Sequence, residues 1–137
     1  MNYSEAEKII KRDVGWHWFW LLNPTLKLSD REITSVSPEQ MLADMFDFVP
    51  SREYTNEKHD CDDQTFEELG HMTRKVRKGR GFAWSKKHAF CVFLTKDELW
   101  IYDRGSIMPY REAMQDDYFR GIYKLTGRIF KRDILVI

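Results

Sequence analysis

The sequence has few of the features that identify common protein classes. Only two of its 137 residues are cysteines, Cys61 and Cys91, too few for the disulfide framework of a small secreted protein. No apolar run approaches the roughly 18 residues that a membrane-spanning helix needs, and the N-terminus lacks the basic and then apolar order of a signal peptide. We therefore expect a cytoplasmic protein with free thiols and no membrane partner.

Net charge and nucleotide-binding motifs are also absent. The 22 basic and 22 acidic side chains give a formal net charge of zero, so no global field attracts nucleic acid or an anionic membrane. The sequence contains no P-loop, no dinucleotide-binding glycine motif and no Gly-x-Ser-x-Gly elbow. It also lacks the closely spaced Cys or His pairs that mark zinc sites. We therefore expect neither nucleotide-dependent chemistry nor a bound metal.

The apolar content is sufficient for one hydrophobic core. Hydrophobic residues make up 42% of the sequence and aromatic residues 15%. No repeat, low-complexity tract or long linker divides the chain, and we expect one domain, residues 1–137. The aromatic segment Trp16–Leu22 is interpreted as core, although a partner surface or a stacking platform for sugars or bases also fits its composition.

Four segments carry helix signals. Ser4 and Glu7 have the spacing of a capping box, and Ser37-Pro38 places a serine at an N-cap and a proline at the first helical position. The central helix is predicted from Cys61 to Arg77, and a further helical pattern spans residues 110–123. The inward face of the central helix is predicted to carry Cys61, Phe66, Leu69, Met72 and Val76.

Apolar runs rich in aromatic and branched residues predict an antiparallel sheet. A weak alternation between Leu26 and Ile33 indicates a further short strand or an extended arm. The four predicted strands contain Phe82, the run after His88, residues 99–103 and residues 134–137.

A hairpin is predicted between the second and third of these strands, because the polar stretch Thr95–Glu98 separates them. If Lys96 and Asp97 form a two-residue turn, His88 and Asp103 become diagonal neighbours on one face of the hairpin. Moving the turn centre back by one residue would place them directly opposite each other. In either register a carboxylate can orient the imidazole.

The stretch Asp60–Asp63 places the Cys61 thiol in the first turn of the central helix, where the helix dipole favours a thiolate. Asp60 is a candidate N-cap, but the neighbouring carboxylates oppose ionisation because like charge raises the pKa of a thiol. A cationic partner is therefore required, and a His88 imidazolium can supply it. With Asp103 orienting the ring, the sequence predicts a Cys61-His88-Asp103 triad. The alternative is a buried structural cysteine.

These motifs resemble those of a family of papain-like and transglutaminase-like cysteine enzymes, which includes small phage and bacterial proteins and the protease domain of a mushroom agglutinin. The resemblance covers residues 26–103, and residues 134–137 resemble the family's last strand. The residues that carry it are Tyr54, Glu57, Asp60–Asp63, His88-Ala89 and Asp103.

The sequence departs from the family pattern at three places. Cys91 stands where the family has asparagine, the phenylalanine after the Cys motif is displaced to Phe66, and the family's Glu-Pro-Gln is Asp103-Arg104-Gly105. The change from Glu to Asp keeps a carboxylate. The missing glutamine removes a side chain that could position the substrate or the oxyanion.

The resemblance implies an α+β fold of papain-like or transglutaminase-like type, with the Cys-bearing helix packed on an antiparallel sheet. It also implies acyl transfer on an amide or ester of a protein or peptide substrate, by hydrolysis or transamidation. We expect the backbone N–H of Cys61, with His59 or Gln64, to donate to the oxyanion. Calcium enters only through the resemblance, because the agglutinin domain depends on it, and no other cofactor is expected.

The one basic cluster follows the central helix. It is interpreted as a solvated helix C-terminus, where the dipole favours cations, or as a contact for phosphate or nucleic acid. The alternative function is a catalytically silent, phage-type binding protein on the same fold that grips a host protein or nucleic acid through this cluster or Trp16–Trp20. Only an enzyme requires a reactive Cys61. The cluster comprises Arg74, Lys75, Arg77, Lys78 and Arg80.

Overall fold

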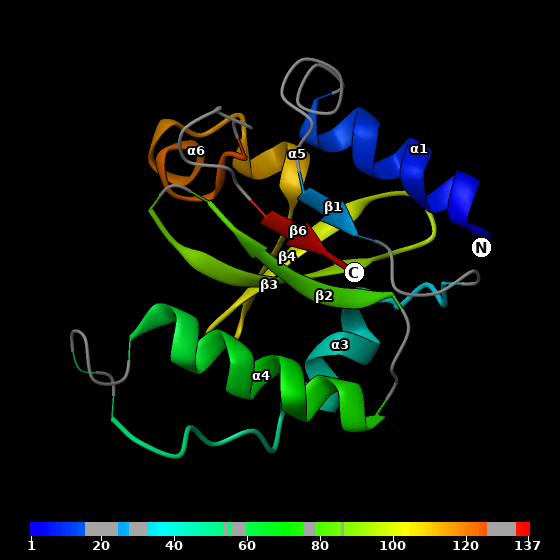
Figure 1. The fold of residues 1–137 in the computed structure, drawn as a ribbon. Helices are drawn as coiled ribbons and strands as arrows, with labels where there is room; N and C mark the ends of the chain where they lie inside the picture. The colour runs from blue at the N-terminus through cyan, green and yellow to red at the C-terminus, as the bar shows by residue number, and fades with distance from the viewer. Residues whose placement is uncertain are drawn as a thin grey trace.

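The computed structural model describes residues 1–15, 25–27, 33–53, 55, 60–75, 79–85, 87–125 and 134–137. These residues form a mixed sheet with helices on both faces (Figure 1), which confirms the predicted α+β class. The strands are β1 (Thr25–Lys27), β2 (Arg80–Trp84), β3 (Ala89–Leu94), β4 (Leu99–Asp103), β5 (Ser106–Pro109) and β6 (Ile134–Val136). The helices are α1 (Tyr3–Val14), α3 (Pro38–Met45), α4 (Cys61–Lys75), α5 (Tyr110–Ala113) and α6 (Asp117–Tyr123).

The six strands lie in the order β1-β6-β2-β3-β4-β5. Only β1 and β6 pair in parallel, and every other pair is antiparallel. The four strands predicted from the sequence are therefore neighbours in one sheet. β5 was not predicted, because its four residues are half-exposed and include Pro109.

The β3–β4 hairpin has the register expected for a Lys96-Asp97 turn. Leu94 pairs with Leu99 and Cys91 with Tyr102, and the Thr95 N–H donates to the carbonyl oxygen of Glu98 at 2.9 Å. This register makes His88 and Asp103 diagonal neighbours and confirms the first of the two predicted arrangements.

One face of the sheet is covered by α4, which packs on β2 and β3 beside α3 (Figure 1). Every residue of β3 is buried, so this central strand contributes side chains to the cores on both faces. The core on the α4 face comprises Val36, Met41, Met45, Met72, Cys91, Phe93 and Tyr102.

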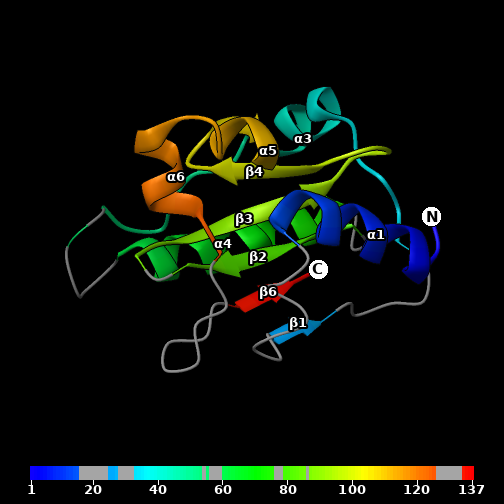
Figure 2. The same cartoon turned by 90° about the horizontal axis from the view of Figure 1, so that it is seen from above.

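The other face is covered by α1, α5 and α6. Figure 2 looks down on this side, with α1 and α5 in front of the sheet. Alternate residues of β3 and β4 point here. The core on this face includes Ala6, Ile10, Phe90, Val92, Leu94, Leu99, Ile101, Tyr110 and Tyr123.

The helix α4 is rotated relative to the prediction. Its buried residues are Thr65, Glu68 and Met72, whereas Phe66 is 46% exposed. The Thr65 hydroxyl explains this rotation, because its Oγ1 lies 2.6 Å from the Cys61 carbonyl oxygen and 3.0 Å from that of Ala89 in β3. The predicted inward position of Phe66 is therefore wrong, and Val76 lies outside the described residues.

Two other helix predictions need correction. The N-cap of α1 is Asn2, whose side chain forms a capping box with Glu5, so the box predicted at Ser4 and Glu7 is wrong. Residues 110–123 form two helices, α5 and α6, because Asp116 caps a new start by accepting from the Tyr118 and Phe119 N–H groups.

The helix α3 follows its prediction. Pro38 begins it, and the Ser37 side chain accepts a hydrogen bond from the Gln40 N–H. In the described part of the chain, none of the helices has the length and apolar character needed to cross a bilayer.

Candidate active site

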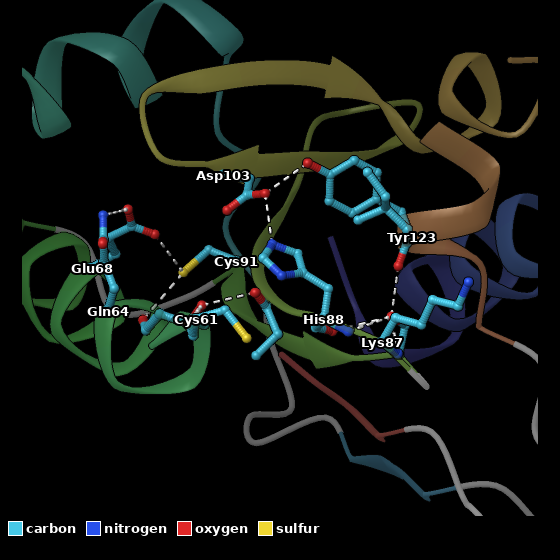
Figure 3. Close-up of polar contacts among 12 residues, drawn as sticks. Cys61, Gln64, Glu68, Lys87, His88, Cys91, Asp103 and Tyr123 are labelled. Atoms are coloured by element: carbon cyan, nitrogen blue, oxygen red, sulfur yellow. Dashed lines mark hydrogen bonds and ion pairs between the residues drawn. The ribbon is translucent and has the colours of Figure 1, made fainter. Parts of the chain in front are cut away.

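His88 and Asp103 are in direct contact at the start of β3 and the end of β4. His88 Nε2 lies 2.8 Å from Asp103 Oδ2, and both side chains are largely shielded from solvent. The Tyr123 hydroxyl, from the last residue of α6, donates to the same oxygen at 2.7 Å (Figure 3). Burial and the hydrogen bond to Asp103 raise the pKa of Tyr123, so this hydroxyl stays protonated and remains a donor.

The contact with Asp103 defines the roles of the two imidazole nitrogens. An ionised carboxylate can only accept hydrogen bonds, so Nε2 of a neutral His88 carries the proton and Nδ1 is left with a lone pair. The ring is held by Phe90, stacked at a centroid distance of 6.3 Å, and by Tyr123, edge-on at 5.9 Å. Nδ1 is therefore the nitrogen that can accept a proton from a thiol.

The backbone of His88 is fixed by Ser85, a buried residue in the connection between β2 and β3. Ser85 Oγ accepts from the N–H groups of Lys87 and His88 at 3.3 and 3.1 Å. The Ser85 hydroxyl also lies 2.7 Å from the Ile122 carbonyl oxygen in α6. One side chain thus links the strand connection that carries His88 to the helix that carries Tyr123.

The backbone after Asp103 forms a two-residue hairpin turn, Arg104-Gly105, between Asp103 and its strand partner Ser106. Arg104 has φ 50° and Gly105 has φ 84°, as in a type I′ turn. Proline cannot adopt a positive φ. A proline could therefore not stand at the position of Arg104 in this turn.

Cys61 is the first residue of α4, and its side chain extends toward the part of the site that contains His88 (Figure 3). No hydrogen bond joins its thiol to the imidazole in that view. The two side chains come from different faces of the sheet. Cys61 belongs to the helix on one face, whereas alternation from Ile101 in the opposite core places Asp103 on the other. Cys61 and Asp103 therefore lie on opposite faces of the sheet.

Asp60 and Asp62 surround the thiol with acidic groups. Asp62 hydrogen-bonds with Asp60, which raises the pKa of Asp62 and lowers that of Asp60. One oxygen from each carboxylate and Cys61 Sγ lie within 4.8 Å of one another. Calcium takes 6–8 oxygen ligands, and the described residues supply two carboxylates and a soft sulfur here. This set does not fit calcium, and the mechanism below uses no metal.

Gln64, a predicted oxyanion donor, lies on the other side of Cys61 from His88 (Figure 3). Its Nε2 is 3.4 Å from Glu68 Oε1, so its amide faces the buried cluster under the sheet. The other carboxylate oxygen of Glu68, Oε2, lies 3.9 Å from Cys91 Sγ. The other predicted donor, His59, lies outside the described residues.

The Glu68–Cys91 cluster is buried, and it favours the neutral forms of both groups. Burial, with repulsion from Asp103, raises the pKa of Glu68 to about 7. Burial and the neighbouring Glu68 raise the pKa of the Cys91 thiol well above its ordinary value. Cys91 is therefore a core residue with a protonated thiol and a poor nucleophile.

The basic cluster is not one continuous surface. Arg80 is 3% exposed, and its guanidinium binds the Met72 carbonyl oxygen and the Asp44 carboxylate. The predicted role of Arg80 in binding an anion at the surface is therefore wrong. Arg74 is exposed at the end of α4. Arg77, Lys78 and the segment Trp16–Trp20 lie outside the described residues. The backbone of Lys75 is described, but its side chain is not.

Sequence reasoning missed two residues of this region, Glu68 and Tyr123. Glu68 lies seven positions after Cys61, two helical turns along the same face. Tyr123 lies four positions after Phe119 on one face of α6, and a buried tyrosine hydroxyl requires a polar partner. These spacings were the available signals, but neither specifies a partner on a distant strand.

Comparison with known proteins gave no match. The chain matches no family model, and neither a curated protein nor a solved structure shows significant similarity to it.

Proposed function

We propose that this protein is a cysteine-dependent acyl-transfer enzyme of the papain-like or transglutaminase-like type, acting on an amide or ester of a protein or peptide. Cys61 is the nucleophile, His88 the general base and then acid, and Asp103 the residue that orients the imidazole. The observation that carries the proposal is the His88–Asp103 pair at 2.8 Å, shielded and fixed by Tyr123.

In the proposed reaction, Cys61 Sγ gives its proton to His88 Nδ1 and attacks the substrate carbonyl carbon. The imidazolium then donates that proton to the departing amine or alcohol as the C–N or C–O bond breaks, which leaves a thioester. Water or an acceptor amine loses a proton to Nδ1 and attacks the thioester, and the thiol is released. Backbone N–H groups in the first turn of α4 are the candidate oxyanion donors.

The contact between the Cys61 thiol and His88 Nδ1 is part of the proposal and is not among the contacts described for the site. Hydrogen bonds between catalytic groups are often long in enzymes without substrate and shorten in the complex. The start of α4 lies beside the start of β3, since Thr65 Oγ1 reaches the Ala89 carbonyl oxygen at 3.0 Å. The proposal requires a displacement of the first turn of α4 that brings the thiol to Nδ1.

The experiment is the pH dependence of iodoacetamide alkylation, with each labelled site identified by mass spectrometry. We expect Cys61 to react well below pH 8 in the wild type and at least tenfold more slowly in His88→Ala. Cys91→Ser is the matched control, because the buried Cys91 thiol does not react in the folded protein. Ordinary thiol reactivity of Cys61 that is independent of His88 would overturn the proposal.

A second candidate function is a silent binding protein, favoured by a group of exposed apolar side chains at the end of α3. Leu42 is 45% exposed, Phe46 91% and Val49 78%. In this function Cys61 is unreactive and the apolar group contacts a protein. Phe46→Ser would then abolish capture of the partner in a pull-down, whereas Cys61→Ala would leave capture unchanged.

A further inference from the structure

A cavity of about 430 Å³ opens beside the His88–Asp103 pair. Its walls come from the connection before β3, the turn after β4, and α6. In Figure 3, Cys61 lies on one side of His88, whereas Lys87 and Tyr123 lie on the other. The imidazole therefore separates the thiol from the cavity. The lining residues are Lys87, His88, Asp103, Arg104, Tyr118, Phe119, Ile122 and Tyr123.

The charge of the cavity is positive. Lys87 and Arg104 line it from two different connections, and both are exposed. The one carboxylate in the lining, Asp103, accepts hydrogen bonds from His88 and Tyr123. Lys87 and Arg104 together outnumber this carboxylate. An anionic group is the favoured occupant of such a space.

The acidic residues at the start of α6 do not offset this charge. Asp116 caps the helix by accepting from the Tyr118 and Phe119 N–H groups, and Asp117 is paired with Arg120. Neither carboxylate lines the cavity.

One wall of the cavity is apolar and aromatic. Tyr118 is 72% exposed, and its ring contacts that of Phe119 edge-on at 5.4 Å. Phe119 stacks on Tyr123 at 6.3 Å, and Tyr123 contacts His88 at 5.9 Å. This continuous row of rings offers a surface for an apolar or aromatic body whose charged end reaches Lys87 and Arg104.

The chemistry of acyl transfer identifies which part of a substrate lies here. The leaving group receives its proton from the imidazole, so it departs on the His88 side of the thiol. We propose that this cavity binds the leaving group and selects one that combines an apolar or aromatic body with a carboxylate, as an acidic peptide segment does. This assignment rests on the proposed acyl-transfer function.

The test separates binding from turnover. The full-length protein is titrated with 3-phenylpropionate, 3-phenylpropionamide and 3-phenylpropylamine, and binding is followed by NMR at the amides of Lys87, Arg104 and Tyr118. We expect the carboxylate to bind at least about tenfold more tightly than the amide or the amine at low salt, and this preference to shrink as ionic strength rises.

Charge reversal provides the decisive variant. Lys87→Glu/Arg104→Glu should abolish the preference for the carboxylate and favour the amine. Lys96→Glu, in the turn at the far end of the β3–β4 hairpin, is the matched control and should bind like the wild type. Tyr118→Ala should weaken all three probes severalfold while the preference for the carboxylate remains, because it removes apolar surface and no charge.

Peptides that differ only in the leaving-group residue complete the test. If turnover is established, a glutamate leaving group should exceed a glutamine or lysine one in kcat/KM, and the double charge reversal should invert that order. Equal binding of the three probes overturns the proposal even if peptides are cleaved. If the protein prefers the carboxylate probe but cleaves no peptide, the cavity is an anion-binding site. Its assignment to the leaving group is then overturned, and the proposed acyl-transfer function fails.

Discussion

The two faces of the sheet bury different numbers of polar side chains. On the α4 face Glu68, Arg80 and Thr65 are buried, whereas the buried charged residue described on the α1 face is Asp13. Asp13 accepts from the Leu99 N–H at 2.8 Å and pairs with Arg12. It thereby joins α1 to β4. On the α4 face, by contrast, Glu68 has a pKa of about 7 and changes charge near neutral pH.

The comparison shows that the free-energy cost of burying polar and charged groups falls mainly on the α4 face. The α1 face provides a mostly apolar platform on which His88, Asp103 and Tyr123 are fixed. The α4 face carries Cys61, at the start of α4, and the buried pair Glu68 and Cys91. Buried polar groups of this kind contribute less to stability than apolar packing does. The four predictions below test this comparison, from the largest expected effect to the smallest.

The largest effect is expected for Asp103→Asn, on the α1 face. The amide keeps the shape of the carboxylate but can donate to Nε2, which favours the imidazole tautomer that has lost its lone pair at Nδ1. We expect kcat to fall by roughly 10²–10⁴ with little loss of stability. Steady-state kinetics with thermal unfolding measures both. Asp97→Asn, in an exposed turn, is the control, and equal activity of the two variants would contradict the orienting role of Asp103.

Asp44→Ala should cause the largest loss of stability on the α4 face. It removes the carboxylate that pairs with the Arg80 guanidinium, whose side chain has no exposed surface. An uncompensated buried cation should lower the free energy of unfolding by about 3 kcal/mol, measured by urea denaturation. Replacing Arg80 by methionine in the same variant should recover part of that loss. A loss below about 0.5 kcal/mol would show that the pair is not needed.

Glu68→Gln should make the α4 face less sensitive to pH. The pKa of Glu68 is raised from 4.5 to about 7 in the folded state, so the folded protein holds a proton that the unfolded chain releases between those values. Wild-type stability from this group is therefore present below pH 4.5 and lost as pH rises toward 7.

Glutamine does not ionise, so the variant should be more stable than the wild type by roughly 2–3 kcal/mol at pH 8 and about equal at pH 4.5. Urea denaturation at the two pH values gives the difference. Glu98→Gln, at a half-exposed position in the β3–β4 turn, is the control. A stability difference that does not change with pH would contradict the raised pKa.

The smallest effect is expected for Tyr123→Phe, which removes one of the two hydrogen bonds to Asp103 Oδ2. The free energy of unfolding should fall by about 1 kcal/mol, and kcat by severalfold, because His88 still holds the carboxylate. Tyr3→Phe removes an exposed hydroxyl from α1, away from the cavity, and should change neither quantity. If both variants behave alike, Tyr123 does not support the site.

The hairpin and the helix starts at Ser37 and Cys61 could be predicted because their signals are local. The polar turn at Thr95–Glu98 sets the register of two apolar runs, and that register brings His88 and Asp103 together. Arg80 shows the limit of this reasoning. Its position in a basic stretch predicts an exposed side chain. Its burial depends on the contact with Asp44, 36 positions away, which the local sequence does not indicate.

The contact between Tyr123 and Asp103 could not be predicted for a similar reason. It depends on where α6 lies over the sheet, and that position follows from the break between α5 and α6 at Asp116. Residue type, the helix start and the hairpin register identified the three candidate catalytic residues together. None of these signals indicated that Cys61 and Asp103 would lie on opposite faces of the sheet.

The hydrogen bonds of Ser85 have a consequence for local unfolding. Because one hydroxyl joins the amides of Lys87 and His88 to the Ile122 carbonyl oxygen, the last turn of α6 cannot open without releasing the backbone that carries the imidazole. These amides should therefore exchange with deuterium as a single cooperative unit. Among the residues that the structure describes, no hydrogen bond joins the first turn of α4 to α6, so this turn should exchange independently. Cys61 and His88 should therefore belong to two different units of local stability.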